Sequence, residues 1–294
     1  MLPLESVPNV SEGRDEQALE AIAAAFTSGG ARLLDVHSDA DHHRSVLTLV
    51  GGDAELEESL LAGIAEAGAR IDLREHEGVH PRVGAADVVP VVPLDPGDMP
   101  RAVAVAAAVA GRVGSELGLP VFLYGESARG LRPAFFRRGG PAELQRRIDA
   151  GELTPDRGPR TLDPAAGAVL IGARRPLVAY NVVLDTADVE VARAIAAAVR
   201  ATSGGLPGVQ ALGVMLARRG LAQVSTNAVD LEATPLHELA ERIRAEAAVL
   251  GVEVVDTELV GLLPASAVVE GSRRALGLPG LTGDRVVELR LLDR

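Results

Sequence analysis

The sequence predicts an α/β (α+β) protein that contains two ferredoxin-like β-α-β-β-α-β subdomains. Hydrophobic periodicity places strand, helix, strand, strand, helix and strand in that order over residues 2–94. The same order returns over residues 175–261. A stretch rich in Gly and Pro, residues 154–174, separates the two copies, so we expect subdomains at 1–174 and 175–294.

In the first subdomain, the spacing of apolar residues identifies the elements. The expected strands are 2–8, 31–39, 42–51, 86–94 and 120–126, and the expected helices are 15–28, 53–71 and 99–117. Asp53 is a suitable N-cap for the helix that follows it. Pro90 and Pro93 cannot donate backbone hydrogen bonds, so we expect the strand at 86–94 to lie near a sheet edge or to be bulged.

The second subdomain follows the same rules. The expected strands are 175–185, 209–217, 221–230 and 252–261, with helices at 186–202 and 235–251. Thr186 or a neighbour caps the first of these helices. A short helix and a closing strand at 285–292 complete the chain. The long segment 154–174 ends in apolar residues, which favours a functional role such as closing over a ligand.

Composition excludes several classes of function. The chain has 294 residues and no Cys, which excludes disulfides, Cys-ligated metals and thiol nucleophiles. Lys is absent, which excludes Schiff-base chemistry, pyridoxal phosphate and a Walker A site. A net charge of −12 argues against nucleic-acid binding. No signal peptide or membrane-length apolar run is present, so we expect a cytoplasmic protein without membrane contact.

The stretch HEGVH at residues 76–80 has the spacing of the zinc-binding motif HExxH. That motif requires a helix, but Gly78 disfavours one and Pro81 forces its neighbour toward an extended conformation. We therefore expect a loop that presents His80, followed by Arg82, Gly84 and a strand, and no metal site. The imidazole of His80 is suited to take up and return a proton near neutral pH. A structural His held by backbone hydrogen bonds is the alternative.

Other polar residues are candidates for binding. Ser11, in the stretch PNVSEG, is placed either to cap the following helix or to bind a carboxylate at its N-terminus. Gln223 and Asn227 interrupt an apolar strand, where they either recognise a heterocycle or pair across the sheet. The HSDADHH cluster at 37–43 is compatible with a metal site, but polar turn chemistry is the better explanation.

Residues 129–175 contain ten Arg against five acidic residues in an otherwise acidic chain. Solvated helix charge explains Arg146 and Arg147. It explains less well the Arg in Gly/Pro-rich sequence, at 157, 160, 174 and 175, which are candidates for a basic wall facing an anionic ligand.

Taken together, the sequence resembles the glutamate formiminotransferase (formimidoyltransferase) family, in its transferase module without the cyclodeaminase domain. The resemblance rests on segments that span nearly the whole chain: VPNVSEG, LLDVHSDADHHRSVLTLVG, HEGVHPRVGAADVVP, LGLPVFLYGESA, DRGP, AVLIGAR, LVAYNVVLDT, LAQVSTNAVDLEATPLHE and ELVGLLP. No single motif is decisive, but the set in this order is specific.

The resemblance implies two subdomains with a folate-binding cleft or tunnel between them, and a homodimer formed through the second subdomain. It implies tetrahydrofolate as co-substrate, with no metal and no pyridoxal phosphate, and His80 as catalytic acid and base. It implies that any cyclisation of the product falls to a separate cyclodeaminase. The residues expected to bind substrate or folate are Asn9, Ser11, Asp39, Arg44, Arg82, Gly84, Tyr124, Gly158, Pro159, Gly167, Gly172, Asn181, Gln223 and Asn227.

The implied reaction transfers the formimino group of N-formimino-L-glutamate to N5 of tetrahydrofolate, with Arg44, Arg82 and the Arg of the 154–174 segment as candidate carboxylate clamps. One departure stands out: many relatives have Asn where this chain has His43, which would alter donor specificity if that side chain touches substrate. Two alternatives remain open. One is a folate-dependent formyl transferase or cyclo-ligase on the same fold, and the other is a noncatalytic folate-binding protein.

Overall fold

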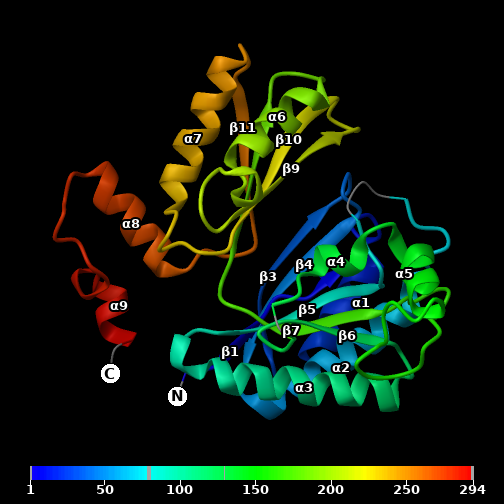
Figure 1. Cartoon of the computed structure of the whole chain (residues 1–294). Helices are drawn as coiled ribbons and strands as arrows, with labels where there is room; N and C mark the ends of the chain where they lie inside the picture. Colours follow the sequence, from blue (N-terminus) through cyan, green and yellow to red (C-terminus); the bar gives the residue numbers. More distant parts are fainter. Residues whose placement is uncertain (1, 78–80, 129, 293–294) are drawn as a thin grey trace. The chain divides into compact units, whose positions relative to one another are not determined.

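The computed structural model describes residues 2–77, 81–128 and 130–292. The chain divides into two compact units, residues 1–175 and 176–294, each with its own sheet and core (Figure 1). The predicted mixed α/β class is confirmed. None of the helices in the described ranges combines the length and apolar character needed to cross a membrane.

The first unit contains a twisted sheet in the order β3–β4–β1/β2–β5–β7–β6. Its strands are β1 (Leu4–Ser6), β2 (Asn9–Val10), β3 (Arg32–Asp39), β4 (Arg44–Gly51), β5 (Ala86–Pro93), β6 (Val121–Gly125) and β7 (Val169–Ala173). Strands β1 and β2 together form one interrupted strand between β4 and β5. Counting that pair as the first strand, β3, β4 and β5 complete the ferredoxin-like order, and β7 and β6 extend the sheet in parallel.

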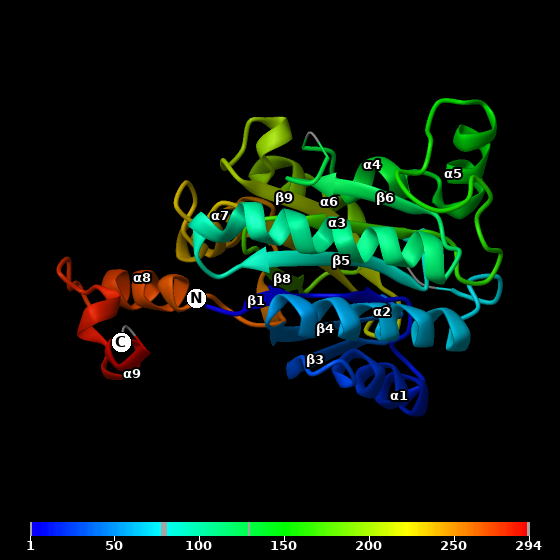
Figure 2. The same cartoon turned by 90° about the horizontal axis from the view of Figure 1, so that it is seen from below.

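Helices cover both faces of this sheet. On one face, α1 (Glu16–Thr27), α2 (Asp53–Arg70) and α3 (Met99–Glu116) lie side by side and enclose the main core (Figure 2). On the other face, α4 (Pro133–Arg137) and α5 (Gly140–Asp149) pack on β5, β6 and β7 and enclose a smaller core (Figure 1). The helical apolar spacing seen in the sequence therefore reflects burial against the sheet.

The second unit has the sheet order β11–β8–β10–β9, again ferredoxin-like. Its elements are β8 (Val178–Leu184), α6 (Val189–Val199), β9 (Val209–Leu216), β10 (Leu221–Ala228), α7 (Leu236–Val249), β11 (Val254–Val260), α8 (Ala265–Ala275) and α9 (Val287–Leu292). Helices α6 and α7 enclose its core with the sheet. The closing strand expected at 285–292 is wrong, because this segment forms α9 after a 3-10 turn, η3 (Gly283–Arg285).

The strand β5 was expected near a sheet edge or bulged, and the second alternative is confirmed. It lies inside the sheet and is fully buried, with a bulge at Asp87 opposite β2. The register of β1 and β2 places Pro90 beside the break between them, where a missing N–H costs little. The N-cap of α2 is Gly52 rather than Asp53, and the N-cap of α6 is Asp188, close to Thr186 as expected. The segment 154–174 is not a free linker, because its apolar end is strand β7 within the first sheet.

Candidate functional site

Three segments that the sequence analysis singled out converge in the first unit: residues 9–15, the turn between β3 and β4, and the described residues of the third segment, 76–77 and 81–84. Ser45 Oγ donates to the carbonyl oxygen of Glu12 at 2.6 Å. His43 bridges the other two segments, with Nε2 at 3.0 Å from Glu12 Oε1 and Nδ1 at 2.9 Å from Glu77 O. Residues separated by more than sixty positions are therefore held in one cluster.

The carboxylate of Glu12 organises the entry to α1. Its Oε1 accepts hydrogen bonds from the backbone N–H groups of Gly13, Arg14 and Asp15 at 2.8, 2.7 and 3.0 Å. Burial would raise the pKa of Glu12, but these amides and His43 outweigh it, and the pKa is lowered. The expectation that amides here would bind a ligand carboxylate is corrected, since the protein's own Glu12 occupies them. Asp15, not Ser11, is the N-cap of α1.

His43 has a left-handed backbone, with φ of 47°. Asn adopts this conformation readily and His less often, so the backbone accounts for either residue at the position. Both ring nitrogens of His43 lie within hydrogen-bond distance of oxygen atoms, one of Glu77 and one of Glu12. Its ring also stacks on His76, with centroids 4.0 Å apart.

Arg82 ties the loop to the β3–β4 turn. Its guanidinium donates to the carbonyl oxygens of His43 and His42, each at 2.9 Å, and to Nε2 of His76. Burial, with Arg82 and His43 nearby, lowers the pKa of His76 to about 4, so this imidazole is neutral at pH 7 and accepts from Arg82. His76 and Glu77 lie in a loop as predicted, and Nε2 of His76 is engaged by Arg82. His80 lies outside the described residues.

A β-bulge sets the orientation of the Asp87 side chain. Asn9 pairs with Val88 and Val10 with Ala86, which leaves Asp87 as the extra residue of β5. Its side chain is buried; Oδ1 accepts from the backbone N–H of Val83 at 2.7 Å, and Oδ2 pairs with Arg137. The sequence analysis missed Arg137. Its only signal was membership of the Arg-rich run, and the bulge that provides its partner leaves no local pattern.

Arginines outnumber acids around this bulge. Burial, together with Arg137 and Arg82, lowers the pKa of Arg44 to about 10, and Asp87 and Asp39 oppose the change. Burial and Arg137 likewise lower the pKa of Arg82 to about 10, against Asp87. Arg44 and Arg82 stay protonated at pH 7, and with Arg137 they outnumber Asp39 and Asp87, so the cluster carries excess positive charge in a partly desolvated setting. Such a setting favours an anionic ligand.

Several predicted binding residues hold the backbone of this region together. Ser11 Oγ donates to Gly84 O at 2.8 Å, and Asn9 Nδ2 donates to Val7 O at 2.9 Å. Asp39 Oδ1 accepts from the backbone N–H groups of Asp41 and His42, both at 2.8 Å, and closes the β3–β4 turn. Their side chains therefore have structural partners whether or not they also contact a substrate.

The predicted glycines lie at close backbone approaches. A Cβ on Gly84 would lie 2.0 Å from Ala168 O, and one on Gly172 would lie 2.2 Å from Tyr124 O. Gly158 and Gly167 also have positive φ, at 77° and 73°, and a Cβ on either would lie within 2.2 Å of a carbonyl oxygen. These contacts explain glycine at the four positions without a ligand. Pro159 is exposed beside Gly158, and Tyr124 is buried in β6.

The remaining Arg of the 129–175 run do not form one wall. Arg146 is exposed and pairs with Glu143 and Glu152, as expected for solvated helix charge. Arg147 is buried instead, donating to Phe135 O at 2.8 Å with its guanidinium 4.6 Å from the Phe135 ring centroid. Arg157 and Arg160 are exposed and donate to backbone carbonyls.

In the second unit, Asn181 and Gln223 meet at Glu258, a residue that the sequence analysis missed. Asn181 Nδ2 lies 3.0 Å and Gln223 Nε2 lies 3.4 Å from the same Glu258 oxygen. Strand alternation puts Asn227 on the same sheet face as Gln223. The register Asn181↔Glu258 could have been anticipated only with the strand pairing known.

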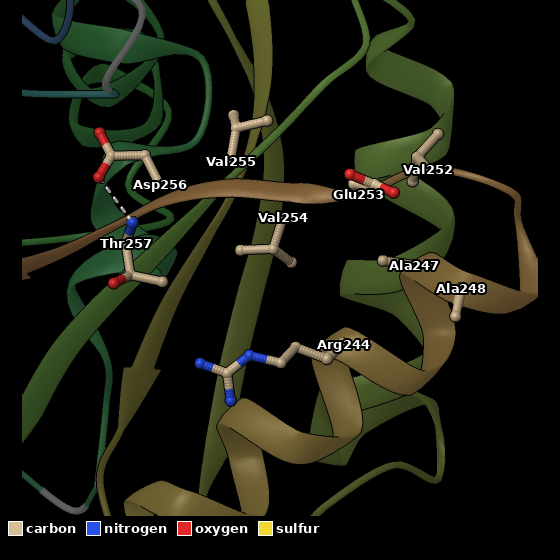
Figure 3. A pocket seen from close by; sticks show the side chains of 9 residues that line it. All are labelled: Arg244, Ala247, Ala248, Val252, Glu253, Val254, Val255, Asp256 and Thr257. Carbon is tan, nitrogen blue, oxygen red and sulfur yellow. Dashed lines mark hydrogen bonds between the residues drawn. The ribbon is translucent and has the colours of Figure 1, made fainter.

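A separate hollow of about 610 Å³ lies between α7 and β11 of the second unit, lined by Arg244, Glu253, Asp256, Thr257 and neighbouring Ala and Val residues (Figure 3). Asp256 Oδ1 accepts from the N–H of Thr257 at 2.9 Å within it. None of the predicted binding residues lines this hollow. The polar cluster of the first unit is therefore the candidate site.

Comparison with known proteins gives consistent matches. Residues 3–174 match the family described as the formiminotransferase domain, N-terminal subdomain, and residues 179–275 match the formiminotransferase domain. Glutamate formimidoyltransferase from Streptococcus pyogenes serotype M1 is 40% identical over 273 residues, 91% of each chain. The enzyme of that name from Thermoplasma acidophilum is 38% identical, covering 98% of this chain and 97% of its own. Formimidoyltransferase-cyclodeaminase from Rattus norvegicus is 39% identical, over 92% of this chain and 51% of its own.

Proposed function

Because this chain belongs to the formiminotransferase family and is a transferase, we propose that it moves the formimino group of N-formimino-L-glutamate to N5 of tetrahydrofolate. The observation that carries the proposal is the cluster of Arg44, Arg82 and Arg137 where the three motif segments converge. Both substrates carry carboxylates, which guanidinium groups bind well.

His80 is the proposed acid and base. N5 of tetrahydrofolate attacks the formimino carbon, a C–N bond forms, and His80 takes the proton from N5. The tetrahedral intermediate then collapses, the bond to the glutamate nitrogen breaks, and that nitrogen receives the proton. The products are 5-formimino-tetrahydrofolate and glutamate, and no metal or covalent intermediate is needed.

The contacts around the loop support this role. The carbonyl of Glu77 is held by His43, and Arg82 is held by the β3–β4 turn, so the chain is anchored before and after residue 80. An anchored loop is a suitable place for a group that must meet a bound substrate. Ser11 bonds the carbonyl of Gly84, and Asp39 closes the β3–β4 turn that holds Arg82.

Two partners follow from the proposal. The relative from Rattus norvegicus is named as a cyclodeaminase as well as a formimidoyltransferase, and we infer that a cyclodeaminase uses the product made here. We also infer a homodimer through the second unit. Apolar side chains are exposed at and beside β11, with Val249 at 80% and Val255 at 52%. Light scattering of the wild type and of Val255→Glu would test the dimer.

The function is tested by mixing purified protein with tetrahydrofolate and N-formimino-L-glutamate and following product formation. His80→Ala is measured beside it, with His237→Asn in α7 as the matched control. We expect a loss of turnover of about 10²–10⁴-fold in His80→Ala only. Turnover that survives in His80→Ala would reject His80 as acid and base. Turnover with formyl donors alone, or tight folate binding without turnover, would favour the formyl transferase or the binding protein instead.

A further inference from the structure

Tyr124 carries a hydroxyl without a structural partner. The side chain is 3% exposed, and within the described residues its Oη forms no hydrogen bond. The guanidinium of Arg174 lies beside Oη, but a guanidinium can only donate, so among the described residues the O–H proton has no acceptor. Burial raises the pKa of Tyr124 to about 12, so the hydroxyl keeps its proton at pH 7 and can donate. A buried donor left unpaired opposes folding, which makes a ligand the natural acceptor.

Arg137 has an unpaired donor in the same patch. Its Nε is buried and, among the residues that the structure describes, has no hydrogen-bond partner, while Nη2 pairs with Asp87. The preceding residue, Phe136, lies 5.1 Å from Phe122 between ring centroids. Phe122 and Tyr124 are two positions apart on β6 and share a sheet face, so Arg137 and Tyr124 border the same apolar patch.

The charge of the patch indicates what the two donors bind. Arg137 lies close enough to Arg44 and Arg82 to disfavour their charged forms. Asp87 is committed to the N–H of Val83 and to Arg137. A ligand here must therefore accept hydrogen bonds and carry negative charge, and a carboxylate meets both requirements.

We propose that Tyr124 and Arg137 bind a carboxylate of one substrate, and that Asp87 orients the guanidinium of Arg137 for this contact. The identity of the substrate rests on the proposed function. The carboxylate belongs either to the formimino-glutamate donor or to the glutamyl tail of tetrahydrofolate.

The test uses Tyr124→Phe and Arg137→Lys in the full chain. Tyr124→Phe removes only the unpaired hydroxyl, so its melting temperature should equal or exceed that of the wild type. Arg137→Lys keeps the charge opposite Asp87 but loses the guanidinium fork. Tyr180→Phe, the other tyrosine, and Arg138→Lys, an exposed neighbour, are the matched controls. KM is measured for each substrate with the other saturating. Binding of N-formyl-L-glutamate and of 5-formyl-tetrahydrofolate is measured separately by calorimetry.

We expect KM or Kd for one substrate to rise about ten- to a hundredfold in both variants, and to stay unchanged in the controls. A rise for the donor assigns the donor carboxylate, and a rise for the folate assigns its tail. Unchanged KM and Kd for both substrates would overturn the proposal, even in a fully active enzyme. If the wild type bound these ligands without turnover and the variants lost binding, the proposed reaction would fail and this site would stand. Absence of binding and turnover in the wild type would reject both.

Discussion

The imidazole Nε2 of His43 lies 3.0 Å from Oε1 of Glu12, and that same oxygen receives the three backbone N–H groups that precede α1. One carboxylate therefore joins the β3–β4 turn to the beginning of a helix. Because Nδ1 of His43 holds the carbonyl of Glu77, the contact extends to the loop before residue 80. The geometry of the candidate site thus depends on a residue that need not touch substrate.

Replacing Glu12 with Gln should weaken this junction. The amide oxygen still accepts hydrogen bonds, but the charge that strengthens them is lost, and we expect unfolding to become easier by about 1–3 kcal/mol. Urea unfolding at pH 7 measures the change. Glu20→Gln, on the exposed side of α1, is the control and should stay within about 0.5 kcal/mol of the wild type.

The pH dependence gives a second check on Glu12. Its pKa in the folded protein lies below the ordinary value of 4.5, so the unfolded chain binds the proton more readily. The difference in stability between wild type and Glu12→Gln should be full above pH 4.5 and shrink as the pH falls through the folded pKa. A difference that stays constant down to acid unfolding would contradict the charge-based explanation.

His76 should make the protein sensitive to mild acid. Burial and the nearby Arg82 lower its pKa from 6.5 to about 4, so the stabilisation from neutral His76 is complete above pH 6.5 and is lost as the pH falls toward 4. His76→Gln still accepts from Arg82 and does not titrate. Between pH 7.5 and pH 5, the urea midpoint should therefore fall more in the wild type than in the variant. Equal falls would show that His76 is not the group responsible.

Two adjacent arginines of α5 should behave very differently when truncated. Arg147→Ala removes a buried guanidinium that donates to Phe135 O and packs on the Phe135 ring, and we expect a loss of about 2–4 kcal/mol. Arg146→Ala removes an exposed ion pair and should cost about 0–1 kcal/mol. Thermal or urea unfolding of both variants measures the two losses of stability. Similar losses would mean that burial does not distinguish them.

The order of elements was predictable because apolar spacing is a local property of the chain. The position of a strand within a sheet is not local, so the prolines of β5 left an edge position and a bulge as alternatives, and the structure has the bulge. The break between β1 and β2 that accommodates Pro90 becomes visible only when the strands are paired. The same limit applies to 285–292, where an apolar segment of eight residues fits a strand or a helix and the structure has α9.

The same difference between local and tertiary information applies to the candidate site. The motif segments were found from residue types, since polar residues beside Gly and Pro mark loops that carry function. The partners of these segments could not be found from residue types, because the contacts of Glu12, Arg137 and Glu258 form only in the tertiary structure. Arg137 depends on the bulge at Asp87, and Glu258 depends on the pairing of β11 with β8. Arg146 and Arg147 are neighbours of the same residue type. They differ in burial because Arg147 lies on the buried side of α5 and Arg146 on the exposed side.

The packing of α1 on α2 offers a paired test of the main core. Gly63 lies in the middle of α2, where a Cβ would lie 2.1 Å from the ring of Phe26, a side chain with no exposed surface. Neither helix can move freely against the sheet, so Gly63→Ala should cost about 1–3 kcal/mol through overpacking, although Ala is the better helix former. Gly111, in α3, has no atom within 4 Å of the position its Cβ would take. At this position only the higher helix propensity of Ala over Gly changes the stability, so Gly111→Ala should stabilise the protein by about 0.5–1 kcal/mol. Urea unfolding of the two variants should give changes of opposite sign, and a gain in stability from Gly63→Ala would show that Phe26 does not pack against α2 as described.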